Sequence, residues 1–335
     1  MMNLLMATYL ITGIAGFIGS SLARAVLAQG DQVRGIDNLS TGKTENIAEI
    51  MGRVDFREAD LLEIQAVQSA CVGVDYVLHQ AAIPSVPKSV LDPLGSNRSN
   101  VDATVNLLVA ARDAKVKRVV FAASSSAYGD TPTLPKHEDM PPNPISPYAV
   151  AKLASEYYMI SFYRCYALET VCLRYFNIFG PRQDPTSPYS GVLAKFITQM
   201  LKGEQPTIFG DGTQSRDFTY VDNAVEANLL ACRAPAGEVA GRVFNVATGQ
   251  RADLNETFRV LKKLTGYTGE VKYAPERAGD VKHSLADTSR AENYLGYKPK
   301  IDFEEGLQRT IEWYRSQENV AGGRPAPDLG VPSRI

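Results

Sequence analysis

An apolar run at residues 7–12 is followed by glycines at regular three-residue intervals, Gly13, Gly16 and Gly19. The apolar residues after them have helical spacing, so the glycines occupy a turn between a strand and a helix. Such a turn lets the backbone curl tightly and leaves the first N–H groups of the helix open to a pyrophosphate. Glycines at this kind of junction can also serve packing alone, so the turn by itself leaves both interpretations open.

The first 23 residues carry no charge, a pattern that a signal peptide or a membrane span would also show. A cationic leading segment is missing, however, and the glycines interrupt the apolar run. We therefore interpret the segment as the buried first strand of a parallel sheet and expect a cytoplasmic location.

Strand-like and helical stretches alternate over the first half of the chain. Strand-like runs fall at residues 7–12, 32–37, 54–57, 75–79, 118–122 and 170–175, and helical patterns at 61–70, 97–114 and 147–167. This alternation predicts an α/β fold with a Rossmann-type doubly wound parallel sheet. Beyond residue 175, helical patterns at 191–202, 222–234 and 254–264 and a short strand at 243–246 predict a smaller, interleaved α/β substrate-binding part.

Composition excludes several classes of partner. The 335 residues are 44% hydrophobic and 21% charged, as in ordinary globular proteins. A net charge of −2 without charged runs predicts no nucleic-acid or membrane partner. The four cysteines show no close pairing and there are three histidines, so we predict no metal site and a small-molecule substrate.

Asp37 ends the second predicted strand, 18 positions after Gly19. A carboxylate there can accept both hydroxyls of an adenosine ribose. NADP would need a cation nearby, but Asn38 follows, so NAD is the favoured cofactor. Alternatively, Asp37 merely opens the turn at residues 37–42.

Tyr148 and Lys152 stand four residues apart after Pro147, which suits the first turn of a helix. On one helix face, the lysine charge would lower the phenol pKa from about 10, so that tyrosinate acts as a base near neutral pH. The ammonium group can also bind a nicotinamide ribose. As a bare pattern, the two residues could be a surface pair.

Three serines at the end of the fifth predicted strand favour a site. Ser124, Ser125 and Ser126 lie at the sheet edge where ligands of open α/β sheets bind. Their hydroxyls can hydrogen-bond a substrate alcohol and relay its proton to the tyrosine. The same serines could be ordinary turn residues.

In this combination the chain resembles the extended short-chain dehydrogenase/reductase superfamily and, within it, the nucleotide-sugar 4-epimerases, from Tyr9 to about Tyr314. Similar segments lie at residues 173–180, 210–218, 244–249 and 277–280. The resemblance implies Ser124 as proton shuttle, Tyr148 as base and Lys152 as its activator. It also implies that Asn177, Arg216 and Arg277 bind a diphosphate and that Val192, Phe209 and Asp280 surround a nucleoside.

A guanidinium group matches the charge and forked acceptors of a diphosphate, although Arg216 could instead pair locally with Asp217. The predicted cofactor-binding residues are Gly13, Gly16, Phe17, Ile18, Gly19, Asp37, Asn38, Ser40, Thr41, Gly42, Asp60, Leu61, Gln80, Ala81, Ala82, Asn100, Ala122, Tyr148, Lys152 and Tyr175. The predicted substrate-binding residues are Ser85, Ser124, Ser125, Ser126, Asn177, Val192, Lys195, Thr207, Phe209, Arg216, Gln250, Arg277, Asp280 and Ser284. These predictions divide the chain into an NAD-binding domain at residues 1–175, a mainly substrate-binding part at 176–318 and a mobile tail at 319–335.

Two departures from the family pattern narrow the function. Dehydratases on this fold carry acids at the positions of Ser125 and Ser126, and decarboxylases carry one at the position of Ser126, so serines here favour an epimerase. Ser284 replaces a bulky tyrosine of members restricted to plain UDP-glucose, which leaves room beside the sugar C2 for an N-acetyl group. Local packing could also select the serine, and a uronic acid remains an alternative.

We therefore predict a UDP-N-acetylglucosamine/UDP-N-acetylgalactosamine 4-epimerase that also takes UDP-glucose and UDP-galactose, with a 4-keto intermediate and retained NAD. The resemblance to the family implies a homodimer, and it also implies that the nucleotide of the substrate is UDP. The alternatives are a UDP-glucuronate 4-epimerase and a net NAD-dependent dehydrogenase or reductase of a nucleotide sugar. A silent NAD-binding regulator is disfavoured because the serine, tyrosine and lysine are all present.

Overall fold

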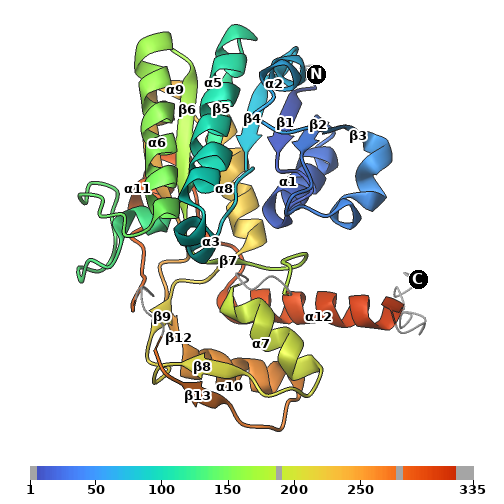
Figure 1. Ribbon diagram of the computed structural model, residues 1–335, viewed down its shortest axis with the longest axis vertical. Helices are drawn as coiled ribbons and strands as arrows, with labels where there is room; N and C mark the ends of the chain where they lie inside the picture. Colours follow the sequence, from blue (N-terminus) through green and yellow to red (C-terminus); the bar gives the residue numbers. More distant parts are fainter. Residues whose placement is uncertain (1–5, 186–190, 277–281, 322–335) are drawn as a thin grey trace, which may run out of the picture.

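The computed structural model describes residues 6–185, 191–276 and 282–321. Its main sheet has seven strands, all parallel, in the order β11-β6-β5-β4-β1-β2-β3 (Figure 1). Their bounds are β1 Thr8–Thr12, β2 Gln32–Asp37, β3 Val54–Glu58, β4 Tyr76–His79, β5 Arg118–Ser124, β6 Glu169–Tyr175 and β11 Arg242–Val246. The predicted doubly wound parallel sheet is confirmed.

Helices cover both faces of this sheet (Figure 1). One face carries α2 (Ile64–Cys71), α5 (Ala103–Asp113) and α6 (Pro147–Tyr166), and the other carries α1 (Phe17–Ala28) and α8 (Val221–Arg233). Val77 and Val119 pack with the first set, whereas Leu78 and Val120 pack with the second. Successive strand residues point to opposite faces, so strands buried on both sides read as continuous apolar runs.

A smaller part lies beyond the carboxyl ends of the strands (Figure 1). There α7 (Val192–Leu201), α10 (Leu254–Thr265) and α12 (Phe303–Ala321) pack together beside paired β8 (Thr207–Phe209) and β13 (Lys272–Ala274). Between these segments the chain returns to the main sheet as α8 and β11. Helix α12 continues past residue 319, where the tail was predicted to begin, and residues 322–335 lie outside the described ranges.

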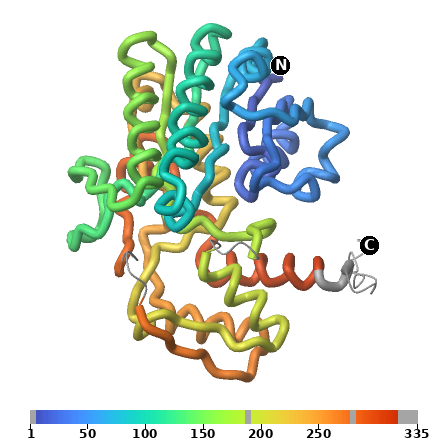
Figure 2. The backbone as a smooth tube through the Cα atoms, viewed as in Figure 1, coloured from blue at the N-terminus to red at the C-terminus, as the bar shows by residue number. Residues whose placement is uncertain are grey.

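The remaining elements are short. They are α3 (Val86–Leu91), α4 (Pro93–Asn97), a π-helical turn Arg98–Asp102, 3-10 turns Thr44–Asn46, Ala48–Arg53 and Ser125–Tyr128, β7 (Ile178–Phe179), β9 (Ser215–Arg216), β10 (Thr219–Tyr220), α9 (Ala236–Val239), β12 (Ala252–Asp253) and α11 (Ser289–Leu295). Figure 2 shows the loop of residues 130–146 beside residues 282–289, and a bridge between Lys136 and Ala286 joins them. Among the described helices, none is long and apolar enough to cross a membrane.

Candidate active site

The glycine turn follows β1, which pairs with both β2 and β4. A Cβ at Gly13 would stand 2.8 Å from the backbone of Ala81, and one at Gly19 would stand 2.1 Å from the carbonyl oxygen of Gly13. Gly13 also has a φ of +68°, which favours glycine. Gly16 caps α1 without a side-chain oxygen, which leaves the first N–H groups of the helix open to an anion. The turn therefore fits a pyrophosphate.

Asp37 lies buried beside this turn at the end of β2. Its carboxylate accepts hydrogen bonds from the backbone N–H of Ala15 at 2.9 Å and of Leu39 at 2.9 Å. Burial raises the pKa of Asp37, and these two hydrogen bonds oppose that shift. The bond from Leu39 shows that Asp37 does open the turn, while the bond from Ala15 holds its carboxylate against the glycine loop. Each oxygen keeps a lone pair for a ribose hydroxyl.

Other predicted cofactor residues lie around the same strand ends. The side-chain amide of Asn38 donates to Asp60 at 2.7 Å. The Tyr175 hydroxyl donates to the Gln80 side chain at 3.2 Å, and burial raises the Tyr175 pKa to about 12. Asn100 accepts from the backbone N–H of Ile83 at 3.3 Å and orders the chain after β4. Phe17, Ile18, Gly42 and Ala82 are partly buried, Leu61 and Ala122 are buried, and Ser40 and Thr41 are exposed.

Ser124, Tyr148 and Lys152 are brought together at the carboxyl end of β5. Ser146 caps α6 by accepting a hydrogen bond from the Ala149 backbone at 3.2 Å, so Tyr148 and Lys152 lie on its first turns. Lys152 Nζ donates to the Ala122 carbonyl of β5 at 2.9 Å. The side chain of Ser124 lies close enough to the Tyr148 hydroxyl to oppose the rise of its pKa.

Burial has the largest effect on the pKa values of Tyr148 and Lys152. It raises the pKa of Tyr148, which the side chain of Ser124 opposes. It also lowers the pKa of Lys152 to about 7, because the ammonium loses hydration. The expectation that Lys152 lowers the Tyr148 pKa is therefore wrong for this structure.

The serine cluster orients Ser124. Ser126 donates to Ser124 Oγ through its hydroxyl at 2.8 Å and through its backbone N–H at 3.2 Å. Because Ser124 Oγ accepts both bonds, its own hydrogen can point to Tyr148. Ser125 and Ser126 also form a 3-10 turn that Ser124 caps, so the turn interpretation holds alongside the site interpretation.

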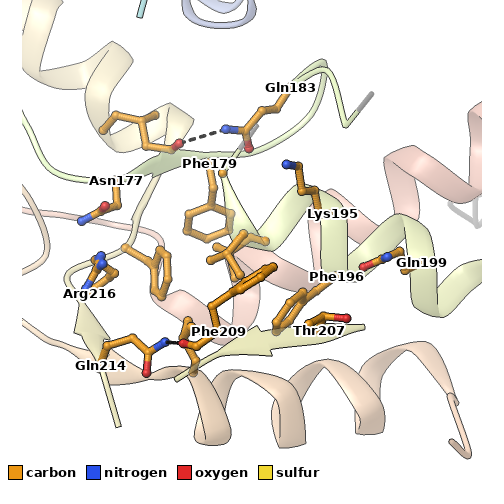
Figure 3. A pocket seen from close by; sticks show the side chains of 16 residues that line it. Asn177, Phe179, Gln183, Lys195, Phe196, Gln199, Thr207, Phe209, Gln214 and Arg216 are labelled. Atoms are coloured by element: carbon orange, nitrogen blue, oxygen red, sulfur yellow. Dashed lines mark hydrogen bonds between the residues drawn. The ribbon is translucent and has the colours of Figure 1, made fainter. Parts of the chain in front are cut away.

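A pocket of about 520 Å³ opens in the smaller part, among β7, α7, β8 and β9 (Figure 3). The predicted substrate residues that line it are Asn177, Val192, Lys195, Thr207, Phe209 and Arg216. Figure 3 shows the rings of Phe179 and Phe209 between Arg216 on one side and Lys195 on the other. Aromatic walls can pack against a base, and cations can bind phosphate oxygens, so the pocket suits a nucleoside diphosphate.

Sequence reasoning missed three amides that line the pocket, Gln183, Gln199 and Gln214. Gln199 lies one helical turn after Lys195, so helix periodicity could have identified it. Gln214 belongs to the similar segment at 210–218, and its amide donates to the Phe209 carbonyl at 2.5 Å. Gln183 follows β7 in a loop and carried no local signal.

The structure places the other predicted substrate residues outside this lining. Ser85 is buried and caps α3 by accepting from the Lys88 backbone at 3.1 Å. Gln250 is exposed. Ser284 accepts from the Asn177 amide at 3.1 Å and so adjoins the edge of the pocket. Arg277 and Asp280 lie outside the described residues.

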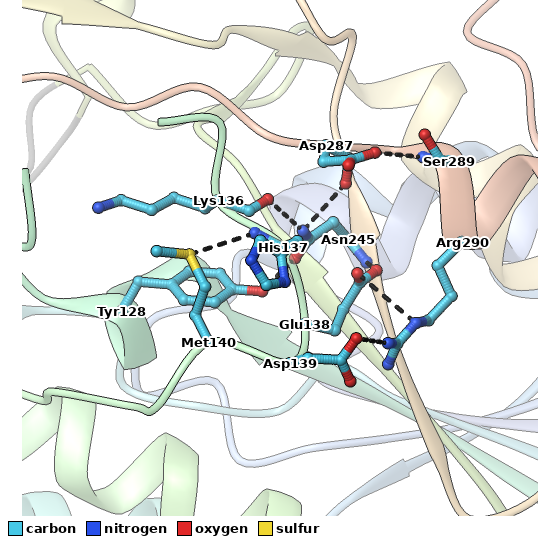
Figure 4. A network of polar contacts seen from close by, with 10 residues as sticks. All are labelled: Tyr128, Lys136, His137, Glu138, Asp139, Met140, Asn245, Asp287, Ser289 and Arg290. Carbon is cyan, nitrogen blue, oxygen red and sulfur yellow. Dashed lines mark hydrogen bonds and ion pairs between the residues drawn. The ribbon is translucent and has the colours of Figure 1, made fainter. Parts of the chain in front are cut away.

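A buried polar network fastens the loop that joins the serine cluster to Tyr148 (Figure 4). The Tyr128 hydroxyl donates to Asn245 Oδ1 at 2.7 Å, and Asn245 Nδ2 donates to the Lys136 carbonyl at 2.9 Å. The Asn245 backbone donates to Glu138 at 2.7 Å, and Arg290 pairs with Glu138 at 3.7 Å. These bonds hold the loop on β11 and thereby limit how far Ser124 and Tyr148 can move apart.

Comparisons with known proteins agree with this geometry. The model of the NAD dependent epimerase/dehydratase family matches residues 9–247. The putative UDP-glucose 4-epimerase of Methanocaldococcus jannaschii is 39% identical over 93% of this chain and 99% of its own length. Among solved structures, the UDP-N-acetylglucosamine 4-epimerase of Methanobrevibacter ruminantium, in complex with UDP-N-acetylmuramic acid, is 42% identical with a TM-score of 0.89 and covers 93% of this chain and 99% of that one. The Bacillus cereus UDP-glucuronic acid 4-epimerase with UDP-glucuronic acid and NAD is 33% identical with a TM-score of 0.84, covering 92% and 99%.

Proposed function

The chain belongs to the NAD dependent epimerase/dehydratase family, and we propose that it is a UDP-sugar 4-epimerase that prefers UDP-N-acetylglucosamine and UDP-N-acetylgalactosamine. The observation that carries this proposal is that Ser124, Tyr148 and Lys152 lie together at the carboxyl edge of the sheet, the same edge at which the glycine turn follows β1. Ser125 and Ser126 supply no carboxylate for elimination or decarboxylation, which favours simple inversion at C4.

NAD is the cofactor of this enzyme. The glycine turn would hold its pyrophosphate, Asp37 its adenosine ribose and Lys152 its nicotinamide ribose. When bound, NAD supplies a hydride acceptor at the sugar C4 that later returns the hydride.

The chain's own residues handle the proton. In its phenolate form, Tyr148 Oη takes the proton of the C4 hydroxyl. Ser124 can relay this proton once its Oγ exchanges a hydrogen bond from Ser126 for one from the substrate hydroxyl. After the resulting 4-keto sugar turns over beside Tyr148, the same tyrosine returns the proton to the new hydroxyl. Hydride and proton are both restored, so the reaction has no net redox change.

The small Ser284 side chain supports the acetamido preference. It adjoins the pocket through its bond to Asn177 and leaves volume that a tyrosine would fill. UDP-glucuronate is the second candidate, because the hydroxyl of Ser125 can donate to a carboxylate. We place the enzyme in the cytoplasm, which suits four cysteines that are all free thiols.

A homodimer is part of the proposal. Leu91 and Leu94 on α3 and α4 are 81% and 74% exposed, and Ile145 and Val150 at the start of α6 are also exposed. A shallow hollow lined by Ile145 and Val150 adjoins α4. An apolar patch of this kind is typical of a protein interface, and a second copy of the chain is its proposed occupant.

Incubating the purified protein with UDP-sugars without added oxidant, followed by chromatography, tests the activity. We expect the two UDP-N-acetylhexosamines to interconvert without accumulation of reduced cofactor. Accumulation of an oxidised sugar would instead identify a net dehydrogenase, and conversion of UDP-glucuronate alone would identify the second candidate.

The Tyr148→Phe variant tests the assigned base. Turnover should fall by at least about a hundredfold, the lower range for losing a positioned acid/base group, while UDP binding persists. Tyr158→Phe, on the exposed side of the same helix, is the matched control and should retain activity. Near-normal turnover of Tyr148→Phe would place the base elsewhere.

A further inference from the structure

Asp217 is fully buried, yet no step of the reaction uses it. Its carboxylate accepts hydrogen bonds from the backbone N–H of Thr248 at 2.9 Å, the hydroxyl of Thr248 at 2.7 Å, and the backbone N–H groups of Gly249 at 3.0 Å and Ala286 at 3.3 Å. The sequence left open a local pair with Arg216, which instead donates to the Lys282 carbonyl at 3.1 Å. Asp217 therefore ties two distant segments to its own.

Two of the three segments border the pocket, and the third carries a residue that the sequence predicted to bind substrate. Asp217 directly follows Arg216, which lines the pocket. The loop at 248–250 carries Gln250, and the segment at 282–287 carries Ser284. The Asp217 carboxylate is thus the point at which these segments are joined.

Two further contacts hold Ser284 to the Asp217 segment. The Ser284 backbone N–H donates to the Ser215 carbonyl at 3.0 Å. Asn177 Nδ2 donates both to the Asp217 carbonyl at 3.1 Å and to Ser284 Oγ at 3.1 Å. Asn177 also lines the pocket, so the position of the Ser284 hydroxyl relative to the pocket follows from where Asp217 lies.

The carboxylate is chemically suited to this task. It is an acceptor only, and its two oxygens satisfy one hydroxyl and three N–H donors that would otherwise be buried without partners. An amide in its place would turn one oxygen into a donor that faces other donors. The connection between the segments is therefore specific to a carboxylate.

We propose that Asp217 is the positioning residue of the sugar subsite, because it sets the place of Ser284 and thereby the discrimination between acetamido and hydroxyl groups at the sugar C2. This inference rests on the proposed function. Asp217 acts through Ser284 and does not itself contact the sugar.

Kinetics of Asp217→Asn in the full-length enzyme test this proposal. We expect KM for UDP-N-acetylglucosamine to rise about tenfold with little change in kcat, and its kcat/KM relative to that of UDP-glucose to fall about tenfold. Bound NAD should be unchanged, because the Asp217 contacts lie outside the glycine turn. Asp211→Asn is the matched control, since the carboxylate of the exposed Asp211 accepts from the N–H and hydroxyl of Thr213 in the same pattern but, among the described residues, accepts no hydrogen bond from a distant segment.

A double-mutant cycle with Ser284→Tyr shows whether Asp217 acts through Ser284. The proposal requires the two substitutions to have non-additive effects on the specificity ratio. Additive effects, or a lower unfolding temperature with an unchanged ratio, would assign Asp217 to stability alone. If Asp217→Asn does not fold, Thr248→Val removes one donor to the carboxylate and should move the ratio in the same direction by less.

The two proposals fail in different ways. A wild-type enzyme that epimerises no UDP-sugar refutes the proposed function. In that case calorimetry with UDP and UDP-N-acetylglucosamine still tests the role of Asp217. Its replacement by Asn should weaken binding of the sugar nucleotide more than binding of UDP. Equal weakening of both ligands overturns the inference.

Discussion

At the scale of single residues, Ser284 offers a direct test of substrate choice. Ser284→Tyr should fill space that an acetamido group needs, and overpacking costs about 1–3 kcal/mol, or roughly 5- to 150-fold in specificity. The kcat/KM for UDP-glucose and UDP-galactose should decrease less than that for the acetamido sugars. The measurement is the ratio of kcat/KM for UDP-N-acetylglucosamine to that for UDP-glucose. Ser289→Tyr, at an exposed position on α11, is the control and should leave this ratio unchanged. If Ser284→Tyr also leaves the ratio unchanged, the assignment of an acetamido substrate is contradicted.

His79 is a buried residue whose protonation state should affect stability. Thr12 Oγ1 and Thr104 Oγ1 lie 2.7 Å from His79 Nδ1 and 2.9 Å from His79 Nε2. Thr104 donates to the Asn100 carbonyl at 2.6 Å, so it accepts from Nε2, and the ring is neutral with its hydrogen on Nε2. Burial, together with the charge of Lys152, lowers the His79 pKa to about 3.

The sign of the pH dependence follows from that shift. Between pH 3 and 6.5 the unfolded chain binds a proton at His79 that the folded protein does not, so the unfolding free energy falls as the pH falls below 6.5. Denaturant titrations measure the unfolding free energy at pH 6.5 and at pH 5. Its decrease between these two pH values should be larger by about 1–2 kcal/mol in wild type than in His79→Gln. Equal losses would mean that His79 is protonated in the folded protein.

At the scale of secondary-structure elements, a buried ion pair fastens the catalytic helix to the sheet. Arg174 on β6 donates to both carboxylate oxygens of Glu156 on α6, at 2.9 and 2.7 Å. The Arg174 guanidinium also lies 4.6 Å from the ring centroid of Tyr128, which follows the serine cluster. Glu156 is one helical turn beyond Lys152, so this contact helps to position the lysine.

Arg174→Met should lower the unfolding free energy by about 3–5 kcal/mol, because it leaves the Glu156 charge buried without a partner. The double variant Arg174→Met/Glu156→Leu removes both charges and should recover most of this loss. Chemical denaturation of the three proteins measures both effects. A double variant less stable than the single one would show that the pair contributes more than mutual neutralisation.

At the scale of the whole molecule, the exposed apolar face of α3 and α4 should form the dimer interface. Leu94→Glu places a charge in that face and should shift the protein from dimer to monomer in light scattering after size-exclusion chromatography. Val72→Glu, at a 65% exposed valine after α2, is the control and should leave the mass unchanged. A monomeric wild type, or a dimer that survives Leu94→Glu, contradicts the proposed interface.

Much of the main sheet could be predicted from the sequence, because its signals are local. Each strand predicted in the first half of the chain lies within two residues of its observed bounds, since a buried parallel strand is a short apolar run between polar turns. The glycine spacing and the four-residue separation of Tyr148 and Lys152 are likewise properties of contiguous sequence. The helices α3 and α12 were not predicted.

Only the tertiary structure decided what the site residues touch and how deeply they are buried. The direction of the Tyr148 pKa shift depends on burial, which no local pattern encodes. Asn177 and Ser284 are 107 residues apart in the chain, and Asp217 and Thr248 are 31 apart, yet each pair is hydrogen-bonded in the folded protein. The sequence by itself thus determined the strands of the main sheet and the chemistry at their ends, because periodicity and spacing are local. Distances, burial and hydrogen-bond partners arise only when distant segments pack together.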